Sequence, residues 1–186
     1  MAENPSHVPS GLEVAAAQRF ATFRNKRVGV ICNPTAVDRH FHHLVDLLRE
    51  AGITIGALFG PEHGVWGQAQ DMIGVDGATD ARTGLPVYSL YGGSFESLSP
   101  SEESLKGLDA LIFDIQDVGS RYYTFVYTMA LCMKVAAKAK VAFFVLDRPN
   151  PIGLDLVEGN LVQPGFESFV GLYPLPNRHG MTAGEL

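Results

Sequence analysis

The chain carries little charge for its length, and its composition lacks the marks of several protein classes. Lys and Arg number 14 and Asp and Glu 20 in 186 residues, so the net charge is −6. Because nucleic-acid binding depends on clustered Lys and Arg, no nucleic-acid partner is expected. Charged residues make up 18% and apolar residues 46%, unlike the highly charged, weakly apolar composition of disordered chains. No apolar run approaches the roughly 20 residues that span a bilayer, so no membrane span is expected.

Cysteine is scarce, and no signal peptide is visible. Cys32 and Cys132 both lie in apolar runs, and we interpret them as small buried side chains of a reduced protein. Residues 1–9 are polar and lack the charged start and apolar stretch of a signal peptide. We therefore expect a cytoplasmic location, or a periplasmic or secreted one if a signal peptide has been removed.

Common cofactor and metal motifs are also missing. Tyr91-Gly-Gly-Ser94 is not a dinucleotide fingerprint, and the chain has neither a phosphate-binding Gly-x-x-x-x-Gly-Lys-Ser/Thr loop nor a Gly-x-Ser-x-Gly nucleophile elbow. His40, His42 and His43 cluster without cysteine or zincin spacing, and we interpret them as the solvated end of a helix. We expect neither a metal nor a cofactor.

Short apolar runs alternate with helical patterns along the chain. Five runs are apolar on both faces, as in buried parallel strands: 27–32, 53–59, 86–91, 110–115 and 141–146. Helical signals occur at 12–23, from Asp38 as N-cap to 48, at 101–106 and at 124–138. The alternation predicts an α/β fold, a Rossmann-like three-layer sandwich with a mostly parallel sheet of about five strands.

The pattern suggests three parts. We expect an N-terminal extension and helix at 1–26, a Rossmann-like catalytic domain at 27–177, and the start of a further domain at 178–186. Thr182-Ala-Gly-Glu185 is a capping box, which marks the start of a helix. Because the sequence stops one residue later, we expect a truncated chain whose C-terminal domain is missing.

Polar side chains follow four of the five predicted strands, where open α/β sheets bind their ligands. We expect these side chains to gather at one edge of the sheet: Asn33 after the first strand, Glu62 and His63 after the second, Asp114, Gln116, Asp117, Arg121 and Tyr122 at or after the fourth, and Arg148 and Asn150 after the fifth.

Glu62 lies in a turn between Pro61 and Gly64, which suits a fixed side chain. If burial raises its pKa, Glu62 is a candidate general acid. The alternative, weighed equally, is a surface turn with a solvated carboxylate.

Asp114 interrupts an apolar strand, so its carboxylate needs a partner, and we expect Arg121 or Arg148 to supply it. Asp117 and Gln116 lie past the strand end and are expected to face a ligand. Arg121 suits a ligand carboxylate, and Tyr122 suits stacking on a sugar ring. Weaker candidates on loops are Glu158, Arg178 and His179.

Several long segments, in order, resemble a known family. They are Leu58-Phe-Gly-Pro-Glu-His-Gly64, Thr83-Gly-Leu-Pro-Val-Tyr-Ser-Leu-Tyr91, Phe113-Asp-Ile-Gln-Asp-Val-Gly119, Leu146-Asp-Arg-Pro-Asn-Pro-Ile-Gly153, Val157-Glu-Gly159 and Arg178-His-Gly-Met-Thr-Ala-Gly-Glu185. From Arg27 to Leu186 the chain is similar to the NamZ-like exo-β-N-acetylmuramidases, bacterial glycoside hydrolases. The resemblance implies release of N-acetylmuramic acid from the non-reducing ends of peptidoglycan fragments in cell-wall turnover. It also implies a Rossmann-like domain followed by a smaller C-terminal domain.

The resemblance implies Glu62 as the catalytic acid, with Asp114 and Asp117 as further carboxyl candidates. It implies that Arg121 or Arg148 binds the lactyl carboxylate of the sugar. The chain departs from the family pattern after Gly64: Trp66 stands where many relatives have arginine, and a further glutamate near Ile73 is missing, with Asp71 or Asp117 as possible replacements.

Three hypotheses follow. The first is the exo-muramidase with a peptidoglycan-derived sugar as substrate. The second is a non-catalytic sugar- or peptidoglycan-binding domain, which the missing glutamate would favour. The third and weakest is a nucleotide-binding Rossmann domain, for which the chain lacks the usual phosphate loop.

Overall fold

A computed structural model describes residues 8–67 and 78–186. Its centre is a six-stranded sheet with the order β3-β4-β2-β1-β5-β6. The strands are β1 (Arg27–Cys32), β2 (Thr54–Gly60), β3 (Ala78–Thr79), β4 (Pro86–Ser89), β5 (Ala110–Asp114) and β6 (Ala142–Val145). All neighbours pair in parallel except β3, which is antiparallel to β4. The five predicted strands are confirmed, and β3 is an addition too short to show in the sequence.

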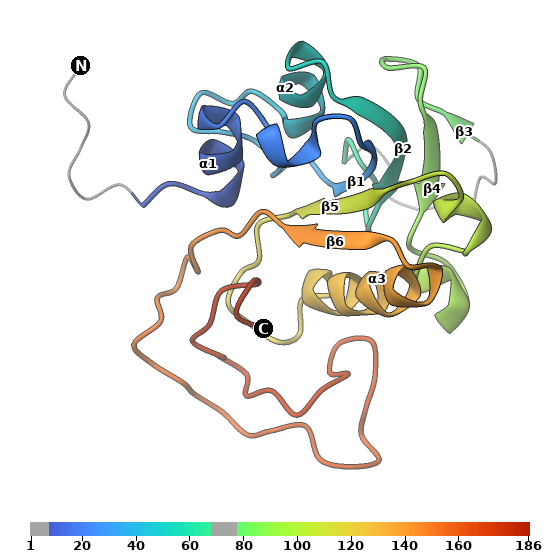
Figure 1. Cartoon of the computed structure of the whole chain (residues 1–186). Helices are drawn as coiled ribbons and strands as arrows, with labels where there is room; N and C mark the ends of the chain where they lie inside the picture. The colour runs from blue at the N-terminus through green and yellow to red at the C-terminus, as the bar shows by residue number, and fades with distance from the viewer. Residues whose placement is uncertain (1–7, 68–77) are drawn as a thin grey trace.

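Helices cover both faces of the sheet, which gives the predicted three layers (Figure 1). Helices α1 (Gly11–Ala17) and α2 (Leu44–Glu50) lie on one face, and α3 (Phe125–Ala139) lies on the other. Short 3₁₀ turns occupy Ala21–Phe23, Phe95–Leu98 and Glu103–Leu105. One core cluster joins α1 and α2 to the sheet, for example through Leu12 and Leu48, and a second joins α3 through Met129 and Cys132. The Rossmann-like α/β fold is confirmed.

Helix α1 begins where Ser10 and Glu13 form a reciprocal capping box. Its first residue, Gly11, lies against the end of β6, where the Gly11 N–H donates to the carbonyl of Asp147 at 2.6 Å. A Cβ at Gly11 would lie 2.5 Å from the Asp147 nitrogen, so the close approach requires glycine. The predicted helix at 12–23 is too long, because Arg19 and Phe20 adopt left-handed backbone conformations that end it.

The predicted start of α2 is wrong. Asp38 does not cap the helix; its carboxylate accepts the backbone N–H groups of His40 and His42 and builds a turn. Phe41, which lies inside the predicted helix, is instead in the turn before it and is 85% exposed. His43 is the true N-cap, and its Nδ1 accepts the N–H of Val45.

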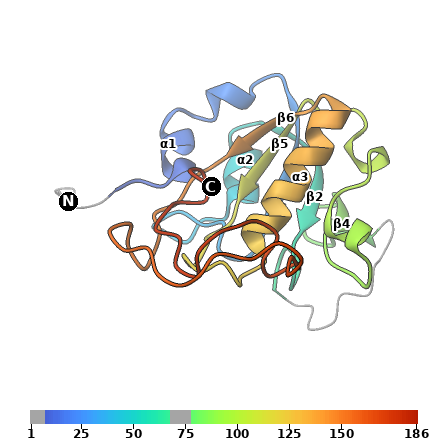
Figure 2. The same cartoon turned by 90° about the horizontal axis from the view of Figure 1, so that it is seen from below.

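After β6 the chain forms a long loop that runs along the outer side of α3 and returns to the carboxyl end of β6 (Figures 1 and 2). Tyr173 lies on α3, with its ring 6.4 Å from that of Tyr127 and 5.4 Å from the ammonium group of Lys134. The Thr182–Glu185 capping box is formed, and the Leu186 N–H bonds to the carbonyl of Thr182 as in a first helical turn. Within 8–67 and 78–186, no helix is long and apolar enough to cross a membrane.

Candidate active site

Glu62 lies in a tight turn at the carboxyl end of β2. The Gly64 N–H closes the turn on the carbonyl of Pro61 at 2.8 Å, and His63 and Gly64 both have positive φ, 70° and 78°. The turn folds back on its strand, because a Cβ at Gly60 would lie 2.9 Å from the nitrogen of Val65. Glu62 is half-buried and His63 is exposed. The turn therefore presents the Glu62 carboxyl at the edge of the sheet.

A threonine hydroxyl binds the Glu62 carboxylate. Thr124 Oγ1 donates to Glu62 Oε2 at 3.0 Å. Thr124 is the N-cap of α3, where the helix dipole favours negative charge. The nearby Glu62 carboxylate raises the pKa of Tyr91 above its ordinary value, through a hydrogen-bond interaction and through its negative charge. Thr124 was not among the residues selected from the sequence, although it opens a predicted helix.

Asp114 and Arg148 form a bidentate ion pair at the ends of β5 and β6. Arg148 Nε and Nη2 donate to the two carboxylate oxygens at 2.6 and 3.0 Å, and Nη2 also donates to the carbonyl of Val37. Asp114 is fully buried. Burial raises the pKa of Asp114, and the Arg148 guanidinium acts against that shift. Of the two predicted partners, Arg148 is confirmed; both oxygens of Asp114 are occupied by it.

The ends of β1 and β5 are joined by hydrogen bonds at the point where the order of the parallel strands reverses, which is where doubly wound sheets bind ligands. Thr35 Oγ1 donates to Asn33 Oδ1 at 2.6 Å and accepts the backbone N–H of Gln116 at 2.9 Å. The Gln116 amide donates to the carbonyls of Asp117 and Pro149. Asn33 and Gln116 thus lie together, and Thr35 links them.

Asp117 and His179 form a buried pair. His179 Nδ1 accepts the N–H of Met181, so the ring proton lies on Nε2, which is 3.2 Å from Asp117 Oδ2. The same oxygen accepts the N–H of Gly119 at 2.8 Å. Asp117 Oδ1 has no partner among the residues that the structure describes. The pair ties the segment after β5 to the end of the chain.

Arg121 and Asn150 also join loop segments. Arg121 Nη1 donates to the carbonyl of Leu175 at 2.7 Å and to that of Asn160. The Asn150 amide donates to the carbonyl of Met181 at 2.9 Å. Both side chains were expected to face a ligand, and in this structure their polar atoms bind the protein's own backbone.

The other loop candidates make no hydrogen bond or ion pair with Glu62 among the described residues. Tyr122 is 58% exposed, and its ring lies 5.6 Å from that of Tyr123. Arg178 pairs with Glu158 at 2.9 Å and also binds the carbonyl of Ile152. Tyr122 is the candidate whose surface is free to stack on a ligand.

Trp66 anchors the chain just after the Glu62 turn. Its indole N–H donates to Asp80 Oδ1 at 2.8 Å, Arg82 lies 4.0 Å from the ring centroid, and His43 packs on the ring at 4.9 Å. His43 is buried and donates from Nε2 to the carbonyl of Asn33, so its interpretation as a solvated helix end is wrong. Although burial acts to raise it, the pKa of Asp80 is lowered by the hydrogen bonds from Thr83 and Trp66.

The region near Ile73, where the second acid was sought, lies outside the described residues, as does Asp71. Within 8–67 and 78–186, no group of three or more His, Cys, Asp or Glu side chains is placed to hold a metal ion.

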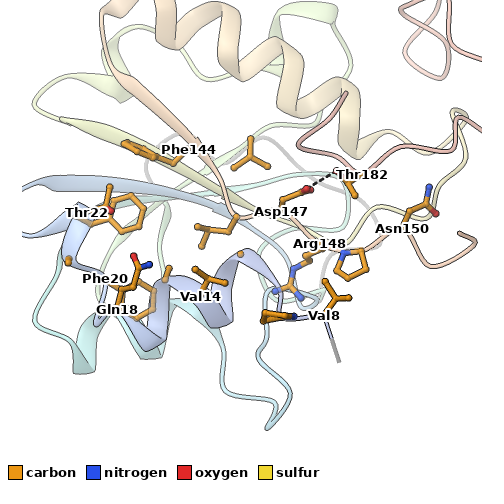
Figure 3. Close-up of a pocket in the computed structure, with 18 of the residues that line it drawn as sticks. Val8, Val14, Gln18, Phe20, Thr22, Phe144, Asp147, Arg148, Asn150 and Thr182 are labelled. Atoms are coloured by element: carbon orange, nitrogen blue, oxygen red, sulfur yellow. Dashed lines mark hydrogen bonds between the residues drawn. The ribbon is translucent and has the colours of Figure 1, made fainter. Parts of the chain in front are cut away.

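Two hollows lie near these residues. One, of ≈ 550 Å³, lies between α1 and the end of β6 (Figure 3); Phe20 and Phe144 line one end, and Asp147, Arg148 and Asn150 line the other. The other, of ≈ 780 Å³, is lined by Tyr88, Tyr91, Phe95 and several serines. Glu62 lines neither hollow.

Comparisons with known proteins agree on one family. The family model described as exo-beta-N-acetylmuramidase NamZ, N-terminal, matches residues 28–186. The peptidoglycan beta-N-acetylmuramidase NamZ of Bacillus subtilis (strain 168) is 48% identical over 180 residues, which are 96% of this chain and 43% of that protein.

Two crystal structures of DUF1343 family proteins from Bacteroides fragilis NCTC 9343 have the same fold. One is 46% identical with a TM-score of 0.87 and covers 95% of this chain and 44% of its own. The other is 37% identical with a TM-score of 0.80, and the match covers 97% of this chain and 45% of that protein. The chain therefore spans less than half the length of these relatives. Since the family model covers most of its residues, the chain belongs to the family of the N-terminal region of the exo-β-N-acetylmuramidase NamZ.

Proposed function

We propose that this chain is the N-terminal, catalytic part of an exo-β-N-acetylmuramidase, a glycoside hydrolase that releases N-acetylmuramic acid from the non-reducing ends of peptidoglycan fragments. Membership of the family and the 48% identity to a peptidoglycan beta-N-acetylmuramidase support the reaction class. The observation that carries the proposal is the Glu62 carboxylate, held by the Thr124 hydroxyl in a turn at the ligand-binding edge of the sheet.

Glu62 is the proposed catalytic carboxyl. It is half-buried, so a substrate can reach it, whereas Asp114 is sealed in its ion pair with Arg148 and Asp117 is buried against His179. Glycosidases use a second group about 5–5.5 Å away for retention or about 6.5–9.5 Å away for inversion. Of Asp114 and Asp117, Asp117 is the better candidate for that role, because its buried Oδ1 has no partner among the described residues, whereas both oxygens of Asp114 are bound by Arg148.

The sugar would lie against the edge formed by Asn33, Gln116 and His63, with the exposed ring of Tyr122 as a stacking surface. Three arginine side chains already bind other groups of the protein: Arg121, Arg148 and Arg178. For Arg121 or Arg148 to bind the lactyl carboxylate, it would have to use a guanidinium N–H group that makes none of these hydrogen bonds. Asn150, Glu158 and His179 would support this edge from behind, because each binds a neighbouring segment of the loop.

We further propose the division into an extension at 1–26, a catalytic domain at 27–177 and the start of a second domain at 178–186. The greater length of the relatives supports a C-terminal domain that completes the site. The proposed location is the cytoplasm, or the periplasm or exterior where a signal peptide has been removed.

The experiment uses a protein that continues through the proposed C-terminal domain. It is incubated with a chromogenic β-N-acetylmuramide, and the matching β-N-acetylglucosaminide is the control. Release from the muramide with little from the glucosaminide is expected. If the folded protein binds peptidoglycan fragments but releases nothing from the muramide, it is a sugar-binding domain instead.

A further inference from the structure

Exposed apolar side chains are concentrated in the long loop after β6. Within 8–67 and 78–186, 14 large apolar side chains are exposed, and seven of them lie in this loop, among them Leu154, Leu156 and Val157. Single exposed apolar residues are ordinary, but a cluster of them marks a surface on which another part packs. The loop therefore has the composition of an interaction surface.

The start of this loop is held against the segment near the end of the chain. Glu158 and Arg178 exchange both backbone hydrogen bonds, at 3.1 and 3.0 Å, and their side chains form an ion pair at 2.9 Å. A Cβ at Gly180 would lie 3.0 Å from the Leu156 carbonyl oxygen and 3.0 Å from Val157 Cγ2. The exposed apolar side chains are thus carried by a backbone of defined shape, although it forms no helix or strand.

The last residues are anchored at the end of β6, beside α1. Thr182 Oγ1 donates to Asp147 Oδ2 at 2.6 Å, and the Gly184 N–H donates to Asp147 Oδ1 at 2.8 Å. The Gly11 N–H, at the start of α1, binds the carbonyl of the same aspartate. A continuation of the chain past residues 182–186 would therefore leave from a fixed place between α1 and the start of the loop.

The ≈ 550 Å³ hollow between α1 and the end of β6 lies at the same place (Figure 3). Thr182 lines it together with Val8, Val14 and Leu154. Leu154 joins the hollow to the loop, since a Cβ at Gly180 would lie 3.3 Å from the Leu154 carbonyl oxygen. We call the exposed apolar residues of the hollow and of the adjoining loop the exit surface. They are 43–68% exposed: Val8, Val14, Leu154, Leu156 and Val157.

The lengths of the relatives indicate what covers the exit surface. This chain covers 43% of the Bacillus subtilis protein and 44% and 45% of the two Bacteroides fragilis proteins. A continuation of similar length would begin in contact with the exit surface, so packing there closes only a short loop and costs little entropy. A second copy of the chain would lose its translational and rotational freedom on binding to the same place.

We infer that the exit surface is the docking face of the C-terminal domain, which packs apolar side chains into the 550 Å³ hollow and onto residues 154–157. The inference rests on the proposed function, which includes that domain. The hollow is also lined by Arg148 and Asn150, which follow β6. Docking there places the second domain beside the carboxyl edge of the sheet, where the proposed substrate lies.

The first test introduces single cysteines into the protein that continues through the C-terminal domain. The native thiols do not interfere, because Cys32 and Cys132 are buried. Leu154→Cys and Val157→Cys each place a thiol on the exit surface, and its rate of labelling by a thiol reagent is measured in the native protein. Both thiols should label at least about tenfold more slowly than an exposed thiol, because labelling requires the domains to separate.

Phe95→Cys is the matched control. The Phe95 side chain is 54% exposed and that of Leu154 is 50% exposed, but Phe95 follows β4, towards the other edge of the sheet. The Phe95→Cys thiol should label rapidly in the longer protein. Exit-surface thiols that label equally fast overturn the inference. Protection that is lost on about a hundredfold dilution also overturns it, because a second copy of the chain then covers the surface.

A charge on the exit surface gives a second measurement. Val157→Asp places a carboxylate in the apolar contact between the domains, so the unfolding temperature of the longer protein should fall by about 3 °C or more. Phe95→Asp should leave the unfolding temperature unchanged. Equal unfolding temperatures for Val157→Asp and the wild type contradict a packed contact at this position.

Neither measurement depends on catalysis, so the two proposals can fail separately. A longer protein that protects both exit-surface thiols but releases nothing from the chromogenic muramide refutes the proposed reaction and supports the docking face. A longer protein that hydrolyses the muramide while both thiols label freely refutes the docking face alone.

Discussion

Arg148 and Asp114 bind each other through two parallel hydrogen bonds of 2.6 and 3.0 Å, at the ends of neighbouring strands β6 and β5. The Asp114 side chain is 0% exposed and that of Arg148 is 9% exposed. Charges so deeply buried are tolerated because each satisfies the other. Removal of one partner leaves the other charge buried and unpaired, so it should affect stability first.

Breaking that pair should destabilise the chain strongly. Arg148→Met leaves an unpaired buried carboxylate, and we expect the free energy of unfolding to fall by about 3–5 kcal/mol in urea titrations. The double variant Asp114→Leu/Arg148→Met should lose less than the sum of the two single variants, because neither charge is left alone. Additive losses would show that the two side chains do not act as a pair.

Gly11 should be intolerant of a side chain. Its Cβ would lie 2.5–2.7 Å from the backbone of Leu146 and Asp147, so Gly11→Ala must push α1 away from the end of β6. We expect a loss of about 1–3 kcal/mol in thermal or urea unfolding. Gly93→Ala is the control, since nothing lies within 4 Å of the added carbon. Equal stability of the two variants would contradict the close packing of α1 on β6.

The stability of the chain should fall as the pH drops from about 7 to 5. Burial lowers the pKa of His43 in the folded protein, with Asp46 opposing the shift and Arg82 adding to it. As the pH falls, His43 is therefore protonated in the unfolded chain before it is protonated in the folded one. The contribution of neutral His43 to the free energy of unfolding is complete above about pH 6.5, and it is lost as the pH falls toward the pKa of the folded state.

Urea unfolding at several pH values checks this, with His43→Gln as the comparison. The variant should be less stable at pH 7 but should lose less stability on acidification than the wild type. If the stability of the wild type and that of the variant depend on pH in the same way, His43 is not the cause of the loss of stability on acidification.

Both cysteines should be unreactive in the folded chain. Cys32 and Cys132 are free and fully buried, and burial raises the pKa of each thiol. A thiol reagent at pH 8 should therefore label neither in the native protein and both in denaturant. Rapid labelling of either native thiol would show that one core cluster opens to solvent.

The strands could be predicted from the sequence because their apolar runs are continuous and bounded by turn residues. The start of α2 could not be predicted, because the Asp38 carboxylate accepts the backbone N–H groups of His40 and His42 in a local turn before the helix begins. Local hydrogen bonds of this kind compete with helix capping and leave the apolar pattern unchanged.

The candidate site was predictable in part. The strand ends located Glu62, Asn33 and Gln116 at one edge, because parallel strands place their carboxyl ends together. Which polar groups bind each other depends on contacts far apart in sequence: Thr124 lies 62 positions from Glu62, and Arg121 bonds across 54 positions to Leu175. No local pattern shows that Arg121 and Arg148 are occupied or that Thr124 reaches Glu62.

The central claim is that the Glu62 carboxylate performs the chemistry, and Glu62→Gln tests it most directly. The substitution keeps the shape of the side chain and removes the ionisable group, so the longer enzyme should lose muramide hydrolysis by a factor of about 10³ or more while its melting temperature changes little. Glu103→Gln, at an exposed glutamate paired with Lys106, should keep full activity. Wild-type rates in Glu62→Gln would contradict the account.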